Sequence, residues 1–187
     1  MFKTLDARNG LTISQINCVM KDSRGYIWLG TPAGLYRYDG YTFHSFQSNS
    51  QDGSSLPDSY INSIQETLEG TLLIKTATGF CIYHPQTENF ERDTKQTFSR
   101  MGIEGKPDVI YIDQHKNVWA SIPNKGVIAY NMQQQTSYEF SYTNDAHGMA
   151  NRSYRPRGTT QDQYPENLRR PNGQHLALRT GDTDGLQ

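Results

Sequence analysis

Long apolar runs, clustered cysteines and an excess of charge of one sign are all missing from this chain of 187 residues. No stretch approaches the roughly 20 apolar residues that a membrane helix needs, so we expect no membrane contact by this segment. The formal net charge is −1, which gives no electrostatic reason to expect nucleic acid as a partner. The first residues also lack the apolar segment of a secretory signal, so the chain is either cytoplasmic or has lost its signal.

Chemistry-bearing motifs are equally scarce. The two cysteines, Cys18 and Cys81, have neither metal-binding spacing nor a CxxC arrangement, and we expect free, buried thiols. The five histidines are scattered along the chain, without the pairing of metal ligands. Nucleophile-elbow motifs and phosphate-binding loops are absent as well. We therefore expect no catalytic residue, no metal site and no cofactor, and the ligand-binding residues remain unknown.

Turn signals and strand-forming residues are concentrated in residues 22–40. The stretch Asp22-Ser-Arg-Gly25 predicts a turn, because Asp accepts hydrogen bonds from backbone amides two residues on and Gly tolerates positive φ. Pro32-Ala-Gly34 and Asp39-Gly40 predict two more turns. Between them lie short runs rich in β-branched and aromatic residues. The pattern predicts an antiparallel meander of four strands over residues 11–46.

This unit recurs twice. Ten pairs of similar residues are 45 positions apart, among them Gly25 and Gly70, and Gly34 and Gly79. A third copy follows at offsets of 46 and then 47, which match Leu73 to Trp119 and Gly79 to Gly126. One residue is therefore inserted between Trp119 and Gly126, and we place it in the turn at residues 123–125. Four-stranded repeats of about 40–50 residues are typical of β-propeller blades.

We predict an all-β fold, with three four-stranded propeller blades at residues 11–46, 56–92 and 106–142 within a partial propeller of residues 1–147. Three blades do not close a ring, since propellers usually have about four to eight. The partners expected are therefore the remaining blades of a larger propeller, or another copy of the chain. From residue 151 onward there is no Val, Ile, Phe, Trp or Lys. Residues 148–187 are expected to form an irregular or disordered tail, and a shifted reading frame would explain their composition.

Structural roles are expected for the residues that recur. Trp28 and Trp119 supply apolar area for packing between blades, although exposed aromatic rings could instead stack on sugars. Asp22 and Asp113 occupy turn positions, which favours turn hydrogen bonds over acid catalysis. In the third copy, Lys116 replaces the turn glycine, and the neighbouring Asn117 could take the positive φ there. The repeat signature comprises Asp22, Gly25, Trp28, Gly30, Thr31, Gly34, Leu35, Tyr38, Asp39, Gly40, Gly70, Gly79, Asp113, Trp119 and Gly126.

The order of these residues resembles a known repeat. The string is Asn9-Gly-Leu-Thr-x-x-x-Ile16, then Asp22-Ser-Arg-Gly-Tyr-Ile-Trp-Leu-Gly-Thr-x-x-Gly-Leu-Tyr-Arg-Tyr-Asp-Gly40, and it closely resembles the two-component regulator propeller repeat. The resemblance covers roughly residues 2–142. In that family such repeats build the N-terminal periplasmic sensor of hybrid two-component systems, common in gut Bacteroides, which detect oligosaccharides and control polysaccharide-utilisation genes.

The resemblance implies a non-enzymatic, periplasmic fragment of a sensor whose intact form binds an oligosaccharide. The start of the chain is similar to the first residues of such a sensor after signal removal, and we expect the kinase, membrane helix and DNA-binding domain elsewhere. One rival is a protein-interaction propeller of the WD-repeat type, which would bind protein partners. A second is a quinone-dependent propeller dehydrogenase, which would need calcium and quinone ligands that the sequence does not display.

Overall fold

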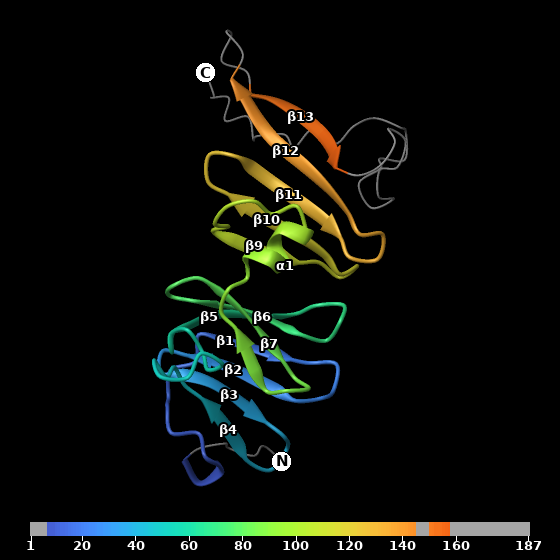
Figure 1. Ribbon diagram of the computed structural model, residues 1–187. Coiled ribbons are helices and arrows are strands. Elements are labelled where there is room, and N and C mark those ends of the chain that lie inside the picture. Colours follow the sequence, from blue (N-terminus) through green and yellow to red (C-terminus); the bar gives the residue numbers. More distant parts are fainter. Residues whose placement is uncertain (1–6, 145–149, 158–187) are drawn as a thin grey trace, which may run out of the picture.

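In the computed structural model, residues 7–144 and 150–157 are described, with side chains up to residue 140. They form three antiparallel sheets stacked along one direction, as Figure 1 shows. The predicted all-β fold of propeller blades is therefore confirmed. A short 3₁₀ helix, Ala7–Asn9, precedes the first sheet, and one α-helix, α1 (Lys95–Arg100), joins the second sheet to the third. The sequence pattern did not predict α1.

Each sheet is a meander in which neighbouring strands follow one another in the chain. The first contains β1 (Cys18–Lys21), β2 (Ile27–Thr31), β3 (Gly34–Tyr38) and β4 (Phe43–Phe46). The second contains β5 (Ile61–Glu66), β6 (Leu72–Thr76), β7 (Phe80–His84) and β8 (Asn89–Glu91). The third contains β9 (Val109–Ile112), β10 (Asn117–Ile122), β11 (Gly126–Asn131), β12 (Thr136–Asn144) and β13 (Ala150–Arg157).

The third sheet has five strands rather than the four that the repeat predicts. β12 contains the expected outer strand, and β13 pairs with it in antiparallel register from Ser137 opposite Arg157 to Asn144 opposite Ala150. β13 lies in the segment for which the composition predicts an irregular tail, so the structure differs from the prediction there. Backbone hydrogen bonds to an open sheet edge need no apolar side chains, which explains how a polar segment forms this strand. The rest of the predicted tail, residues 158–187, lies outside the described residues.

The middle sheet is buried on both faces, and its side chains alternate between two cores. Leu72 and Ile74 of β6 pack in the core shared with the first sheet. Leu73, between them, packs in the core shared with the third sheet. β7 alternates in the same way, with Tyr83 in the first core and Ile82 in the second. A strand covered on both faces reads as a continuous apolar run, which is why β6 and β7 carry few polar residues.

Aromatic side chains fill the first core. Trp28 is fully buried there, with its ring centroid 5.1 Å from Tyr83 and 5.9 Å from Phe46. Gly30 lies where the first two sheets approach each other closely. A Cβ built at Gly30 would lie 2.6 Å from Cγ2 of Ile61 and would also overlap Sγ of Cys18. This close approach explains why the first blade has a glycine at this position.

The two ends of the stack differ in their connections. The β1–β2 and β3–β4 turns lie at one end, which we call the hairpin end. The other end carries the connections between sheets, residues 47–60 and 92–108, and we call it the crossover end. The innermost strands lie side by side across the blades: Nδ2 of Asn17 donates to the carbonyl of Ile61 (2.8 Å), and Nε2 of Gln65 to that of Ile110 (2.7 Å).

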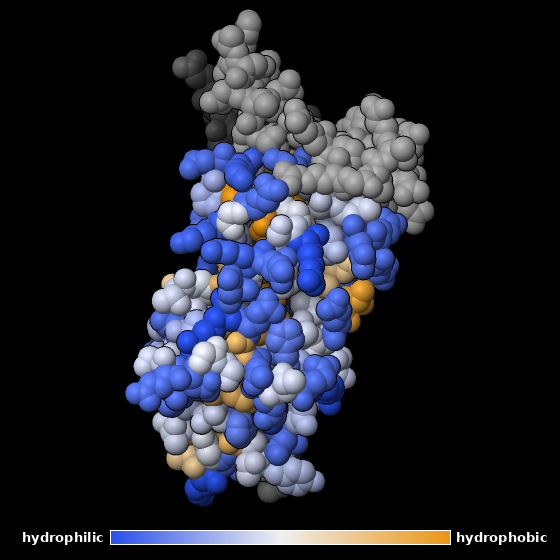
Figure 2. Space-filling view, viewed as in Figure 1, coloured by the Kyte–Doolittle hydropathy of each residue, from blue (hydrophilic) through white to orange (hydrophobic). Residues whose placement is uncertain are grey.

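The outer faces of the stack expose apolar side chains on their innermost strands. Val19 is 64% exposed on the face of the first sheet that points away from the second. Tyr111 and Val109 are 58% and 56% exposed on the corresponding outward face of the third sheet. The side of the molecule in Figure 2 is otherwise largely hydrophilic. Exposed apolar groups on both outer faces fit blades that would have further neighbours.

Candidate functional site

The carboxylate of Asp22 is the centre of the first blade's hairpin end. Its Oδ1 accepts hydrogen bonds from the backbone amides of Arg24 (3.1 Å) and Tyr26 (2.8 Å). Its Oδ2 accepts one from the indole Nε1 of Trp28, at 2.9 Å. Asp22 is only 4% exposed. One buried carboxylate therefore shapes the turn and also holds the ring that fills the first core.

The third blade repeats this arrangement. Oδ2 of Asp113 accepts from Nε1 of Trp119 (3.0 Å), and Oδ1 accepts from the backbone amides of His115 (2.8 Å) and Asn117 (2.9 Å). Burial alone would raise the pKa of Asp113, but the hydrogen bonds from Trp119 and Asn117 outweigh it and hold the pKa below its ordinary value. Sequence reasoning assigned the turn role to the aspartates and missed the bond to the indole.

The second blade lacks both partners of this bond. Thr67 stands in place of the aspartate and Leu73 in place of the tryptophan. Oγ1 of Thr67 instead pairs with Oγ1 of Thr71 at 2.8 Å, across the turn. The aspartate and the tryptophan six positions later are thus both present in the first and third copies and both replaced in the second. This joint occurrence could have indicated from the sequence that the two side chains touch.

The turn position three residues after Asp22, Thr67 and Asp113 has positive φ in all three blades. Gly25 has φ 94° and Gly70 has φ 77°. The third copy has Lys116 at this position, with φ 62°. The expectation that Asn117 supplies the positive φ is therefore wrong, and the lysine itself adopts the left-handed conformation. Its ammonium donates to the backbone carbonyl of Glu66 at 3.2 Å, a contact that helps to offset the backbone strain.

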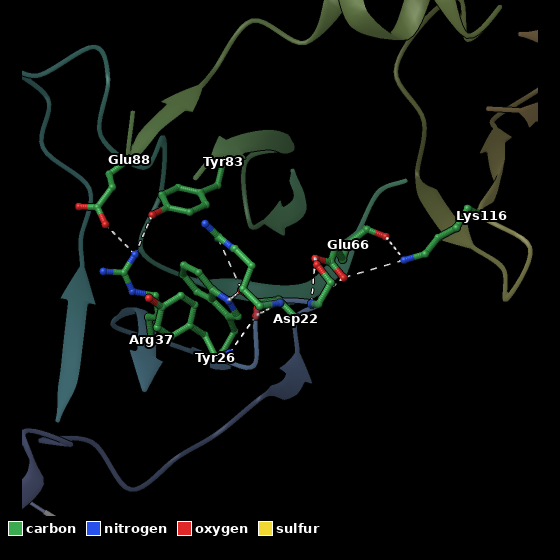
Figure 3. Close-up of polar contacts among 10 residues, drawn as sticks. Asp22, Tyr26, Arg37, Glu66, Tyr83, Glu88 and Lys116 are labelled. Carbon is green, nitrogen blue, oxygen red and sulfur yellow. Dashed lines mark hydrogen bonds and ion pairs between the residues drawn. The ribbon is translucent and has the colours of Figure 1, made fainter. Parts of the chain in front are cut away.

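Glu66, at the end of β5, connects the hairpin ends of all three blades, as Figure 3 shows. Both of its carboxylate oxygens accept from the backbone amide of Ser23 (3.0 Å each), and Oε1 also accepts from the Ser23 hydroxyl (2.6 Å). On the other side, Nζ of Lys116 lies 4.0 Å from Oε2 of Glu66. A residue of the middle blade therefore contacts the aspartate turns of both neighbours.

Arg37 makes a second connection between the first two blades. Its Nη1 donates to Oε1 of Glu88 (2.6 Å), in the β7–β8 turn, and to the hydroxyl of Tyr83 (3.2 Å), in β7 (Figure 3). The guanidinium lies 5.1 Å from the ring centroid of Tyr26 and 5.7 Å from that of Trp28. Stacking on aromatic faces suits the planar, weakly hydrated guanidinium.

Ionisation in this cluster follows the contacts. The hydrogen bond from Arg37 lowers the pKa of Glu88, against a smaller effect of burial. Burial would lower the pKa of Arg37, but the hydrogen bond to Glu88 and nearby charges raise it overall. Burial also raises the pKa of the Tyr83 hydroxyl. The pair Arg37 and Glu88 is therefore charged at neutral pH, and Tyr83 is neutral.

The other signature residues have structural contacts at the turns and in the core. Oγ1 of Thr31 donates to the carbonyl of Gly34 at 2.7 Å, and Thr76 repeats this bond to Gly79 at 2.9 Å. Leu35 is fully buried in the first core. The Tyr38 hydroxyl donates to the Gly40 carbonyl (2.7 Å), and Oδ1 of Asp39 accepts from the amides of Tyr41 and Thr42 (2.8 Å each). Gly126 has a φ of 121°, which favours glycine.

The inserted residue of the third copy lies where the spacing places it, in the turn between β10 and β11. That turn spans residues 123–125, whereas the first blade has two residues there, 32 and 33. Asn124 takes a φ of 61° in the longer turn. The strands on either side keep their register, so the insertion changes only the turn.

Reactive side chains do not gather elsewhere in the part of the chain that the structure describes. Within residues 7–144 and 150–157, no group of three His, Cys, Asp or Glu residues is placed to hold a metal ion. His84 pairs with Glu91 at 3.1 Å. Cys18 and Cys81 are free thiols, half-buried and buried respectively, and burial raises the pKa of Cys81 to about 12. None of the helices in these residues is long and apolar enough to cross a membrane.

Comparison with known proteins gives a match that includes the Asp22 turn of the first blade. Residues 10–33, which contain Asp22, Gly25 and Trp28, match the family model described as two component regulator propeller. The first blade is thus similar to a two-component regulator propeller repeat. The resemblance seen in the sequence is thereby confirmed at residues 10–33, which include both residues of the aspartate–tryptophan hydrogen bond.

The chain spans only a part of the proteins that it matches. A histidine kinase P4 from Formosa agariphila is 36% identical over 56 residues, which are 30% of this chain and 4% of that protein. The extracellular domain of one hybrid two-component system from B. thetaiotaomicron aligns with 76% of this chain and 18% of its own, at 19% identity and a TM-score of 0.48. Another such domain from the same organism aligns with 78% and 28%, at 15% identity and a TM-score of 0.37.

Proposed function

We propose that this chain is a non-enzymatic part of the sensor domain of a hybrid two-component regulator. The observation that carries the proposal is the family match at residues 10–33, on the turn whose aspartate and tryptophan are bonded to each other. The relative named as a histidine kinase and the neighbours named as extracellular domains of hybrid two-component systems support it. The location that this role implies is the periplasm.

We propose further that the intact sensor responds to an oligosaccharide. A ligand shifts a sensor between two arrangements only by the difference in its affinity for them. The contacts of Glu66 and Arg37 tie neighbouring blades together, so a displacement of one blade would be passed to the next rather than absorbed between them. The ligand would then bias the whole propeller, and through it the kinase.

The test uses the full-length sensor of which this chain is proposed to be a part. Its purified sensor region is screened on a glycan array, and binding is measured by calorimetry with the oligosaccharides that respond. Binding of one oligosaccharide class without turnover is the expected result. Binding of another ligand class, with no response to any oligosaccharide, would overturn the sugar proposal but leave the sensor role standing. Stable capture of a protein partner, in a reading frame without a kinase, would overturn both and favour a scaffold propeller.

A further inference from the structure

Arg92 holds the connection between the first and second blades through polar contacts of two of its nitrogens. Its Nη2 lies within hydrogen-bond distance of the carbonyl oxygens of Asn49 (2.9 Å), Asp52 (2.7 Å) and Leu56 (3.1 Å), and of the Ser55 hydroxyl (2.7 Å). Its Nε donates to the Ser55 carbonyl at 2.8 Å. Residues 49–56 therefore wrap around one guanidinium with their backbone oxygens pointing inward.

The loop itself is built to present these oxygens. Oδ1 of Asn49 accepts from the amide of Gln51 (3.0 Å), and Oδ1 of Asp52 accepts from the amide of Ser54 (2.9 Å). The Ser55 hydroxyl closes the loop by accepting from the amide of Asn49, at 2.9 Å. Such side-chain turns bend the backbone without help from sheet hydrogen bonds. The carbonyls of Asn49 and Asp52 accept the turn amides of Asp52 and Ser55 (3.2 Å each), and the same two carbonyls converge on Arg92.

The loop is also docked on the second blade next to Arg92. The amide of Phe90, in β8, donates to the carbonyl of Ser54 at 2.7 Å. Leu56, at the end of the loop, is fully buried in the core between the first two blades. Arg92 follows β8 directly and is half-buried. The guanidinium thus lies beside the connection that leads from β4, the outer strand of the first blade, to β5, the innermost strand of the second.

Several carbonyl oxygens and a hydroxyl around one point form a site for a cation. A guanidinium enters this site with two nitrogens, Nη2 among four of the oxygens and Nε at the Ser55 carbonyl, whereas an ammonium has one nitrogen and cannot occupy both positions. We propose that residues 49–56 form a guanidinium-binding loop, with Arg92 as its built-in ligand. Arg92 is a positioning residue: it fixes the crossover that sets the first blade against the second. This inference does not depend on the proposed sensor function.

The test removes the guanidinium and then supplies it again. In Arg92→Ala, amide hydrogen exchange at residues 49–55 should rise about 10- to 100-fold, because a hydrogen bond from a charged group contributes about 1.5–3 kcal/mol. Free guanidinium chloride at ~20 mM, far below denaturing concentrations, should restore much of the protection. Sodium chloride at the same concentration should not. The matched control is Arg100→Ala, which removes the same charge from an exposed position on α1.

A second variant covers the case in which the alanine variant does not fold. Global unfolding would raise exchange in β2 and β6 as well as in the loop. Arg92→Lys keeps the charge and most of the stem, so it should loosen the loop while the strands stay protected. The proposal is refuted if the loop of the lysine variant exchanges like the wild type. It is also refuted if sodium and guanidinium restore the alanine variant equally, since the effect would then be charge screening.

Discussion

Asp22→Asn separates the two tasks of the Asp22 carboxylate. Asparagine keeps one acceptor oxygen and replaces the other with an NH₂ donor. It can therefore serve the turn amides or the indole of Trp28, but not both. Trp28 is fully buried, so water cannot replace the lost acceptor, and an unsatisfied buried donor costs about 1–3 kcal/mol. We expect Asp22→Asn to lower the free energy of unfolding by about 2 kcal/mol.

The chain contains its own matched comparison for this substitution. Asp113→Asn breaks the same bond in the third blade, where Trp119 is only half-buried. The indole there is closer to solvent, so we expect a smaller loss of about 1 kcal/mol. Urea unfolding of the 187-residue chain, followed by tryptophan fluorescence and circular dichroism, measures both differences at constant pH and salt.

A double-mutant cycle with Trp28→Phe isolates the bond. Phenylalanine removes the indole N–H, so Asp22→Asn should cost less in that background by about 1–2 kcal/mol. The cavity left by the smaller ring affects both arms of the cycle and cancels. Additive losses to within about 0.5 kcal/mol would show that the carboxylate and the indole are not coupled, and the account of this bond would be wrong.

Three further predictions concern the backbone, a thiol and pH. Gly25→Ala should destabilise by about 1 kcal/mol through its φ of 94° alone, because a Cβ there meets open space; Gly30→Ala should cost more, about 2–3 kcal/mol, because its Cβ overlaps Ile61. Urea midpoints that rank the two the other way would contradict this. Cys81 should be alkylated by iodoacetamide far more slowly than Cys18 in the folded chain, because Cys81 is fully buried and burial raises its pKa to about 12. Mass spectrometry with and without urea tests this. Because the pKa of Asp113 is lowered in the folded chain, its carboxylate adds to the free energy of unfolding above the ordinary aspartate pKa of about 4, and this contribution is lost as the pH falls through the folded pKa. Asp113→Asn should therefore flatten the pH dependence of the urea midpoint in this acidic range.

The sequence was most informative where structure depends on residues close in the chain. The turn at Gly25 could be predicted because Asp followed by Gly three positions later is local turn chemistry. The inserted residue between β10 and β11 could be placed because a repeat makes its own register visible. The burial of Trp28 followed from the same repeat, since a large ring at a recurring strand position packs between blades.

Contacts between distant segments could not be predicted in this way. The loop around Arg92 brings it to Asn49, 43 positions earlier, and no pattern within a blade marks that pair. Arg37 reaches Glu88 across 51 positions, and the third blade has no arginine in the corresponding place. Lys116 was misjudged because its left-handed φ is supported by a contact with Glu66, in another blade.

The sequence by itself determined the architecture: the period, the turns, the strands and the large rings that separate the blades, all of which follow from local backbone preference and from apolar alternation along a strand. Only the tertiary structure decided which polar groups join one blade to the next, and that β13 (Ala150–Arg157) extends the third sheet. The physical reason is that a buried hydrogen bond depends on where two groups meet in space. The stretch from Asp22 to Trp28 shows both contributions. Its turn could be predicted from the sequence, whereas the hydrogen bond between its carboxylate and its indole was found only in the folded structure.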